Sequence, residues 1–354
     1  MGKGQPRRGR RRGSGPTVSD VARAAGVSQM TVSRVINREA NVREETRAKV
    51  EEAIAALGYV PDPAARSLAG GGQCRIALLY SNPSAAYLSE FLAGSIAGAA
   101  ASGAQLGIEH WDGAEGVEAL ARRLAAHRTD AVLLPPPLCE SAALLDALTG
   151  TDMPVAQVAT GEPSPVAHAV SIDDRAAAEA MTAHLIVLGH RRIGFIAGEP
   201  NLTASGLRRA GYEQALASAG ITAAPALIRG GNFTYRSGLA AGEALLSLSS
   251  PPTAIFASND DMAAAVVSVA HRRHLEVPGD LSVCGFDDTA MAITVWPELT
   301  TIRQPVAEMA SAATELLVKA VRARRAGEEL APQHLQLPFA VISRDSVAPP
   351  RRSD

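Results

Sequence analysis

The sequence is poor in cysteine and in aromatic residues, and it has no long hydrophobic run. Its three cysteines are far apart and fit no CxxC spacing, which predicts neither a disulfide framework nor a zinc site. Apolar runs such as IALLY are too short to cross a bilayer, and no hydrophobic signal segment follows the basic N-terminal residues. We therefore expect a cytoplasmic protein without a membrane partner, a metal or a cofactor.

Catalytic motifs are missing as well. The eight histidines accompany no GxSxG or HExxH motif, and the phosphate-binding patterns GxxxxGK[ST] and GxGxxG are absent. Hydrophobic residues make up 47% of the 354 residues, which suits two or three globular domains with cores of Ala, Val, Leu and Ile. We expect a protein that binds its ligands and is not an enzyme.

Charge is divided unevenly along the chain. Residues 1–72 hold 13 Lys or Arg against 7 Asp or Glu, whereas the other residues hold 21 against 29. A basic head on an acidic body is typical of a protein that binds a polyanion through that head only. The arginine-rich residues 1–16 are predicted to be a disordered tail, which either adds solubility or attracts phosphates without reading sequence.

Residues 17–60 carry the pattern of three short helices. Thr17 can cap the first helix, with Asp20 at the capping-box position, and Gly26 ends it. After the short turn GVS, Ser28 can cap a second helix, and REETRAKVEEAIAALGY forms the third. Two helices joined by so tight a turn predict a helix-turn-helix, whose second helix lies in the major groove of DNA. An ordinary amphipathic helix with a solvated face is the alternative.

The rest of the chain alternates between strands and helices. From residue 75 onward, apolar strands such as RIALLYS, AVLLPP, RIGFIAG and AIFASND are separated by helices rich in Ala and Leu. This alternation predicts parallel sheets covered by helices on both faces. One series precedes HLIVLGH and another follows it. The predicted fold is therefore a small all-α helix-turn-helix headpiece and an α/β body of two parallel-sheet lobes.

Motifs in both parts of the chain resemble a single family. TVSDVARAAGVSQMTVSRVIN and VREETRAKVEEAIAALGYVPDPAARSLAGG lie in the head, and HLIVLGHRRIGFIAG, FASNDDMA, VCGFDDT, PELTTIRQP and VISRDS lie in the body. Over nearly the whole chain they closely resemble the lactose-repressor family of bacterial transcription regulators. The resemblance implies a repressor that binds a pseudo-palindromic operator as a dimer. It also implies a small-molecule effector, a sugar or a purine, and a body folded like the periplasmic sugar-binding proteins, with three crossings between lobes.

By position in the family motif, Gln29 and Met30 are the residues that read bases, and Arg34 follows one turn later. Gln can bond an adenine edge, Arg a guanine edge, and Met can touch a thymine methyl. Short polar side chains suit phosphates better than bases. We expect further DNA contacts from Thr17, Ser28, Thr31, Ser33 and Asn37. The apolar side of the second helix takes either Met30 or Thr31, a choice that the pattern leaves open.

The composition of residues 61–72, PDPAARSLAGGG, is that of a linker. Isolated helices shorter than about 12 residues are marginal in water. In the resembling family this segment is a hinge helix that orders on operator DNA and inserts a leucine into the minor groove, and Leu68 holds that position here. We therefore predict DNA contacts from Leu68 and from Arg66. An inert, exposed leucine is the alternative.

Ligands of open α/β sheets bind at the carboxyl ends of the strands. Asn259 follows AIFAS, Asp287 follows LSVCGF, and Arg208 lies in LRRAGY. The resemblance implies that these three residues bond the effector, and their guanidinium, amide and carboxylate groups suit sugar hydroxyls or a heterocycle edge. Arg209 is the alternative to Arg208 as the arginine that binds the effector. Either Asn259 or Asp260 is expected to cap the following helix.

The first lobe offers fewer candidates for the effector site. Tyr87 and Phe91 lie where the family places an aromatic wall of the pocket, and Ser81 follows the first strand. Trp296 either stacks on a sugar ring in the pocket or fills the junction between the lobes.

We expect four parts of the chain, namely a tail at 1–16, a headpiece at 17–60, a hinge at 61–72 and an effector-binding and dimerisation domain at 73–348. The first lobe is expected at about 74–188 and 306–332, and the second at about 190–304 and 334–348. Asp173 fits the family's acidic position at the link between lobes, but Asp174 replaces the Asn that commonly follows, which leaves the role of the pair open. The C-terminal VISRDSVAPPRRSD has no leucine heptad, so we predict a homodimer and no tetramer.

Three alternatives belong to other functional classes. A cytoplasmic solute-binding protein would not need the basic head, and a sugar- or nucleotide-processing α/β enzyme would need the missing motifs. A nucleoid-type protein would bind DNA without specificity, and it would show steep salt dependence and little preference for an operator.

Overall fold

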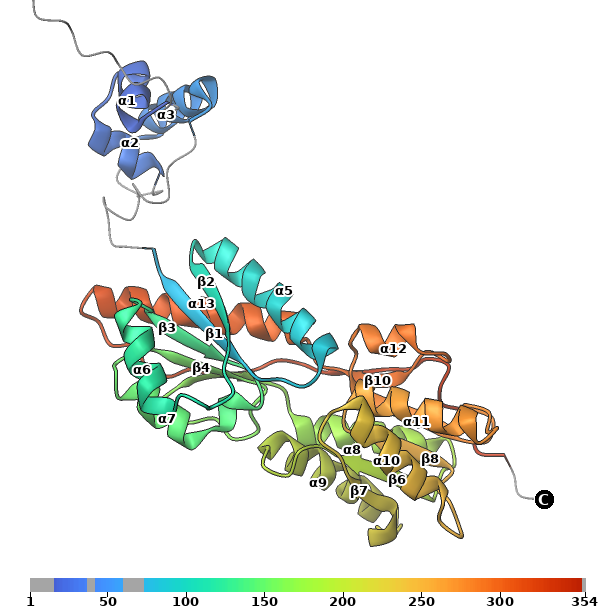
Figure 1. Cartoon of the computed structure of the whole chain (residues 1–354). Coiled ribbons are helices and arrows are strands. Elements are labelled where there is room, and N and C mark those ends of the chain that lie inside the picture. Colours follow the sequence, from blue (N-terminus) through green and yellow to red (C-terminus); the bar gives the residue numbers. More distant parts are fainter. Residues whose placement is uncertain (1–15, 37–41, 60–72, 352–354) are drawn as a thin grey trace, which may run out of the picture. The chain divides into compact units, whose positions relative to one another are not determined.

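The computed structural model describes residues 16–36, 42–59 and 73–351. The chain divides into two compact units, Met1–Gln73 and Cys74–Asp354, and each unit is described by itself (Figure 1). The predicted DNA contacts of Asn37, Arg66 and Leu68 lie outside the described residues. The predicted hinge and almost all of the predicted tail lie outside them too.

The N-terminal unit is built from three helices, α1 (Val18–Ala25), α2 (Gln29–Ile36) and α3 (Glu44–Leu57). The capping box at α1 is confirmed, because the Thr17 hydroxyl and backbone N–H both donate to the Asp20 carboxylate, at 2.7 and 3.0 Å. Gly26 ends α1 in the left-handed region, with φ of 66°, where glycine pays no steric penalty. The Ser28 hydroxyl accepts from the Thr31 N–H at 3.1 Å and caps α2 as predicted.

A small core closes this unit. Its buried apolar side chains come from all three helices and from the residue that follows α3, and they are Val21, Ala22, Val32, Val35, Val50, Ala53 and Tyr59. The predicted three-helix headpiece is confirmed.

The first lobe of the body contains a six-stranded sheet whose strands are all parallel. Its strand order is β11 (His334–Gln336), β5 (His168–Ser171), β4 (Val155–Val158), β3 (Ala131–Leu134), β1 (Arg75–Tyr80) and β2 (Gln105–His110). One face packs on α5 (Ala85–Ser102) and α13 (Val306–Arg325), and the other on α6 (Val117–Ala126), the 3-10 turn η1 (Leu138–Glu140) and α7 (Ala142–Thr149). The helices α5 and α13 approach closely at Gly94, where an added Cβ would lie 2.0 Å from the Ala307 carbonyl oxygen.

The second lobe has the same layered plan. Its sheet runs in the order β12 (Ala340–Ile342), β10 (Thr300–Arg303), β9 (Ser282–Asp287), β8 (Ala254–Ala257), β6 (Ile193–Ala197) and β7 (Ile228–Gly230), and only the β10–β12 pair is antiparallel within the described residues. One face packs on α8 (Asp174–Val187) and α9 (Thr203–Ser218). The other packs on α10 (Tyr235–Leu246), α11 (Asp260–Arg272) and α12 (Ala290–Thr294), while η2 (Pro225–Leu227) precedes β7.

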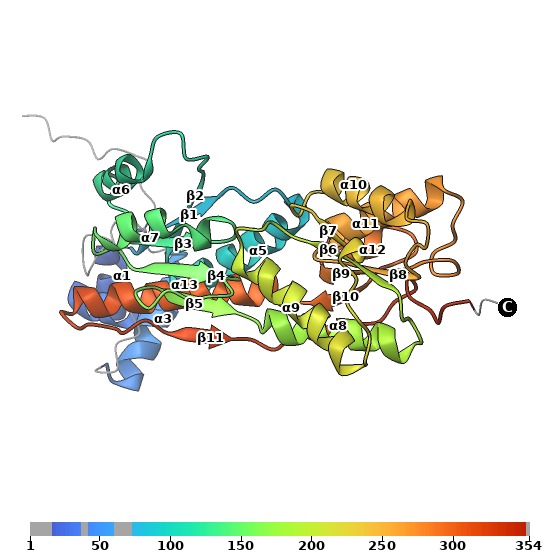
Figure 2. The same cartoon turned by 90° about the horizontal axis from the view of Figure 1, so that it is seen from below.

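The alternation of side chains along the strands explains this layering. Neighbouring residues of a strand point to opposite faces, so Phe195 joins the core under α8 and α9, whereas Ile196 joins the core under α10 and α11. The inner strands β3, β4 and β8 are buried along their whole length and consist mostly of apolar residues without alternation in polarity, whereas the edge strands β2 and β11 are largely exposed. The two predicted parallel-sheet lobes are confirmed, and they lie side by side (Figure 2).

The chain crosses between the lobes three times, but two of the predicted crossing points are wrong. The helix α8 lies beside α9 in the second lobe, so the first crossing falls between Ser171 and Asp174, well before residue 189 (Figure 2). β11 pairs with β5 of the first lobe, so the last crossing falls after Gln336 and not before His334. Both crossings are only a few residues long and contain no glycine, and the first includes Asp173, the residue that the family resemblance places at the link between the lobes. The segment HLIVLGH, at which the two series of strands and helices were divided, forms the end of α8 and the turn after it, inside the second lobe.

No helix among the described residues combines the length and the apolar character needed to cross a membrane. Within the same residues, no group of His, Cys, Asp or Glu is arranged to hold a metal ion, and the three cysteines are buried and unpaired with one another.

Candidate functional site

The helix α2 presents a polar, exposed face in the N-terminal unit. The sequence left open whether Met30 or Thr31 lies on the apolar side of α2. Met30 is 66% exposed and Thr31 is half-buried, so Thr31 is the residue that lies nearer the apolar side, next to Val32. Gln29 and Arg34 are also exposed, and the Gln29 amide nitrogen donates to the Ser19 hydroxyl of α1 at 2.8 Å. The side chains that the sequence predicts to read bases therefore stand together on one accessible face.

The body has a pocket between the two lobes, with an empty volume of about 690 Å³ including its mouth. Both lobes line it. The first lobe contributes Asn82, Pro83, Ser84, Tyr87, Pro136, Pro137, Glu140 and Ala159, and the second contributes Glu199, Leu202, Ala204, Arg208, Asn232, Phe233, Asn259, Asp287 and, at a crossing, Gln304.

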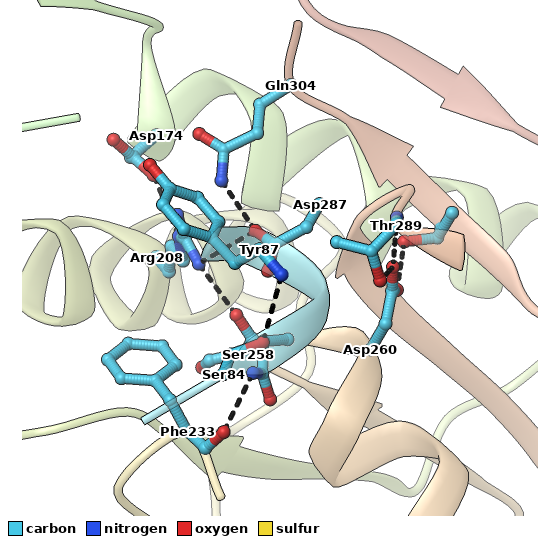
Figure 3. A network of polar contacts seen from close by, with 12 residues as sticks. Ser84, Tyr87, Asp174, Arg208, Phe233, Ser258, Asp260, Asp287, Thr289 and Gln304 are labelled. Carbon is cyan, nitrogen blue, oxygen red and sulfur yellow. Dashed lines mark hydrogen bonds and ion pairs between the residues drawn. The ribbon is translucent and has the colours of Figure 1, made fainter. Parts of the chain in front are cut away.

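Arg208 is the centre of a buried ion-pair network in the second lobe (Figure 3). Its Nε donates to Asp174 Oδ1 at 2.7 Å, and its Nη1 donates to the Ser258 carbonyl at 2.7 Å and lies 3.8 Å from Asp287 Oδ1. The guanidinium carbon lies 3.6 Å from the centre of the Phe286 ring. A planar guanidinium is suited to this combination of stacking and directed hydrogen bonds.

Burial raises the pKa values of the two acids of this network, Asp174 and Asp287. Burial raises the pKa of Asp174, and the nearby Arg208 offsets part of that rise. Burial also holds the pKa of Asp287 well above its usual range, again against the attraction of Arg208. Asp287 has φ of 111°, a strained conformation for a residue other than glycine. Such strain at the end of β9 is typical of functional sites, because only a well-packed surrounding structure can hold it.

Two buried polar atoms in the pocket have no hydrogen-bond partner among the described residues. They are the Tyr87 hydroxyl oxygen, from α5 of the first lobe, and Gln304 Oε1. The Gln304 amide nitrogen donates to Asp287 Oδ1, which orients its amide group beside the Arg208 network (Figure 3). Leaving a buried polar atom without a partner costs about 1–3 kcal/mol. A ligand with hydroxyl or amide groups in this pocket would supply the missing partners.

Asn259 and Asp260 have structural hydrogen bonds as well. Asn259 is the residue of the pair that caps α11, because its Oδ1 accepts from the Met262 N–H at 3.0 Å. Asp260 is fully buried and accepts from the Thr289 N–H and from the hydroxyls of Thr289 and Thr301. Burial raises the pKa of Asp260 to about 7. Asp260 therefore ties the loop after β9 to α11 and does not line the pocket.

Of the seven predicted effector residues, the structure brings four to this pocket, namely Tyr87, Arg208, Asn259 and Asp287. Phe91 is buried behind Tyr87, with the ring centres 6.4 Å apart, and Ser81 does not line the pocket. Trp296 is 74% exposed and lies in a different hollow, beside His271 and His274. The prediction that Trp296 stacks on a ligand in the pocket is therefore wrong.

Two open choices are also resolved. Arg209 is exposed and pairs with Glu213 at 2.8 Å, so Arg208 is the arginine of the pocket. At the lobe link, Asp173 caps α8 by accepting from the Ala176 N–H at 2.9 Å. The buried partner of Arg208 is the next residue, Asp174.

Sequence reasoning missed Asn82, Ser84, Glu140, Phe233 and Gln304 as pocket residues. Asn82 and Ser84 follow the carboxyl end of β1, and Gln304 follows that of β10, so the position rule for open α/β sheets selects them. Glu140 ends the 3-10 turn η1, Phe233 lies in the loop between β7 and α10, and no pattern of the sequence places either of them in the pocket.

Comparisons with known proteins agree with this geometry. Residues 17–62 match the family described as "Bacterial regulatory proteins, lacI family", and residues 182–347 match the "Periplasmic binding protein-like domain". The HTH-type transcriptional regulator CelR of Thermobifida fusca is 34% identical over 344 residues, which cover 94% of this chain and 98% of CelR.

Two solved structures extend the likeness. The structure titled "transcriptional regulator CelR-cellobiose complex" has a TM-score of 0.71 at 32% identity and covers 94% of this chain and 99% of that one. A lac repressor dimer bound to operator and an anti-inducer has a TM-score of 0.70 at 28% identity and covers 95% of this chain and 100% of that one. With an exposed helix-turn-helix face, a two-lobed body and relatives that match over nearly their full length, the chain belongs to the lacI family of bacterial regulatory proteins.

Proposed function

We propose that the chain is a transcriptional repressor that binds a pseudo-palindromic operator as a homodimer and responds to a small-molecule effector held between the lobes. The observation that carries this proposal is the combination, in one chain, of an exposed polar face on helix α2 with a pocket between the lobes that leaves two buried polar atoms unpaired. The relatives CelR and DegA, which match over nearly the whole chain, are named as transcriptional regulators, so the proposal includes no catalytic step.

For DNA we propose that Gln29, Met30 and Arg34 read base edges in the major groove, while neighbouring hydroxyls hold phosphates. One headpiece of this size neutralises few phosphates, so high affinity requires two headpieces on one palindrome. The lac repressor structure is that of a dimer on its operator, which supports this arrangement. Residues 17–60 would then form the DNA-binding domain, with Arg66 and Leu68 of the hinge adding minor-groove contacts.

For the effector we propose an uncharged sugar. Arg208 is the one cation that lines the described part of the pocket, and Asp174 and Asp287 already offset its charge. Glu140 and Glu199 add negative charge, which disfavours a phosphorylated or carboxylated ligand. Sugar hydroxyls both donate and accept, and they match the unpaired Tyr87 hydroxyl and Gln304 carbonyl. The related CelR has been solved with cellobiose, which makes that disaccharide the first probe.

The test begins with selection of bound sequences from a random DNA pool by the full chain at near-physiological salt. A pseudo-palindromic motif with two half-sites is expected. Binding without sequence enrichment, both alone and with a mixture of sugars and purines, would refute the repressor function.

The effector is then identified by fluorescence anisotropy on the selected operator. Cellobiose, glucose, glucose 6-phosphate and guanine are added separately at millimolar concentration. We expect a neutral sugar to shift operator affinity, and a response to glucose 6-phosphate or guanine alone would contradict the proposed effector class.

A further inference from the structure

The helix α9, which carries Arg208, has no cap of its own. Its N-cap residue is Leu202, whose side chain cannot accept a hydrogen bond, whereas α8 and α11 are capped by Asp173 and Asn259. The first N–H groups of a helix have no partner within the helix and need an acceptor from elsewhere.

That acceptor comes from the other lobe. Glu140 ends η1, between β3 and α7 of the first lobe, and its Oε2 accepts from the Thr203 N–H at 2.6 Å. Its Oε1 accepts from the Thr203 hydroxyl and, at 3.3 Å each, from the Gly161 N–H and the Thr160 hydroxyl. Four donors from two lobes therefore converge on one carboxylate at the edge of the pocket.

The backbone at this contact is fitted closely. The Gly161 N–H donates to the Thr203 hydroxyl at 2.9 Å, so a loop of the first lobe touches the start of α9 directly. A Cβ added at Gly161 would lie 2.7 Å from the Thr203 hydroxyl oxygen and 2.7 Å from a methyl carbon of Leu207. An added methyl group therefore requires the Thr203 and Leu207 side chains to shift or the lobes to move apart.

We propose that Glu140 is a positioning residue that holds the lobes closed over the pocket by capping α9 across the cleft. A carboxylate at a helix N-terminus is favoured by the helix dipole as well as by its hydrogen bonds. Arg208 lies five residues after Thr203 on the same helix. Fixing the start of α9 against the first lobe therefore fixes Arg208 relative to Tyr87 on the opposite wall. This role does not depend on the identity of the effector or of the DNA site.

The test measures the distance between the lobes in the full chain without any added ligand. Cysteines are introduced at Arg122→Cys on α6 and Arg236→Cys on α10, both exposed, and carry spin labels. The native cysteines are buried, so selective labelling is practical. Pulsed electron resonance then gives the distance distribution in the parent and in three variants.

The variants separate the carboxylate from other causes. Glu140→Gln replaces one carboxylate oxygen by an amide N–H₂ group, which cannot accept from the Thr203, Gly161 and Thr160 donors. Gly161→Ala adds a methyl group to the same contact without changing its charge. Glu118→Gln removes an exposed acid from the first turn of α6 and serves as the matched control. We expect the ratio of open to closed molecules to rise about tenfold in Glu140→Gln and Gly161→Ala, and to stay at the parent value in Glu118→Gln. Unfolding midpoints of the variants identify any that fail to fold.

Several outcomes would overturn the proposal. An unchanged distribution in folded Glu140→Gln would exclude a role for the carboxylate, even if Gly161→Ala opens the cleft. An equal shift in Glu118→Gln would assign the effect to net charge. A parent protein with no closed population would show that the contact does not hold the lobes without a ligand.

Discussion

The headpiece and the body place their functional side chains in opposite surroundings. On α2 the candidate base-reading residues are exposed and contribute little to the core, which consists of apolar residues on the other side of the helix. In the body, Arg208 and Asp287 are almost fully buried and hydrogen-bond to residues that shape the second lobe. DNA recognition and stability can thus vary independently in the headpiece, whereas ligand binding and stability are coupled in the pocket.

The strongest test of this coupling is Arg208→Ala. It leaves Asp174 and Asp287 buried without their counter-charge, and breaking such a buried pair typically costs about 3–5 kcal/mol. We expect both a large loss of stability and a loss of effector binding. Both tryptophans, Trp111 and Trp296, lie in the body, so their fluorescence during urea unfolding reports on the body alone.

The matched control for that experiment is the neighbouring residue. Arg209→Ala removes an exposed pair with Glu213 and should cost less than about 1 kcal/mol. If the two variants unfold at the same urea concentration, the ion-pair network of the body does not carry the stability assigned to it.

Asp260→Asn tests the coupling through pH. The pKa of Asp260 is about 7 in the folded body, and an unfolded aspartate has a pKa near 4. The folded state therefore retains a proton that the unfolded chain releases between about pH 4 and pH 7. The stabilisation from neutral Asp260 is complete below about pH 4 and is lost as the pH rises toward 7.

The asparagine variant does not titrate, so its stability relative to the parent should increase with pH. The expected slope is up to about 1.4 kcal/mol per pH unit between pH 5 and pH 7, measured by urea unfolding. The control is Asp146→Asn at an exposed site, whose free energy of unfolding should change with pH as that of the parent does. A parallel profile for Asp260→Asn would show that the carboxyl group titrates normally.

In the headpiece, Gln29→Ala should behave in the opposite way. Losing a bidentate contact to a base costs about 1–3 kcal/mol of operator binding and relaxes the preference at one base position. Effector binding should stay unchanged, and the loss of the exposed Gln29–Ser19 hydrogen bond should lower stability by about 1 kcal/mol or less. Repeating the DNA selection with this variant measures the preference, and Lys49→Ala, exposed on α3, is the control. A uniform loss of affinity for all sequences would assign Gln29 to phosphate contact.

The same contrast explains what could be predicted from the sequence. Caps, turns and the apolar side of α2 are local features, so Thr17, Gly26 and Ser28 were placed correctly from neighbouring residues alone. The alternation of apolar strands and helices likewise predicted both sheets. The residues of the pocket depend on which distant segments meet. The rule that ligands bind at the carboxyl ends of strands could therefore identify only residues at a strand end, such as Asp287 at the end of β9.

The failures have a common physical cause. Trp296 follows α12 beyond the end of β9 and has no strand end to orient it, so its exposure depends on packing that the local sequence does not encode. Glu140 forms its bonds with Thr203, 63 positions further along the chain and in the other lobe. The lobe boundaries were misplaced because a crossing of two or three residues has no distinct composition.

The smallest expected effect, and the sharpest test of the comparison, comes from two buried tyrosines. Tyr87 has an unpaired hydroxyl in the pocket, whereas the Tyr212 hydroxyl donates to the Ile193 carbonyl at 2.8 Å. Tyr87→Phe should raise the stability of the body by about 1 kcal/mol or less and weaken binding of the responding sugar about tenfold. Tyr212→Phe should instead lower stability by about 1 kcal/mol and leave sugar binding unchanged. If both variants lose stability and neither loses affinity, the Tyr87 hydroxyl has a protein partner and is not reserved for a ligand.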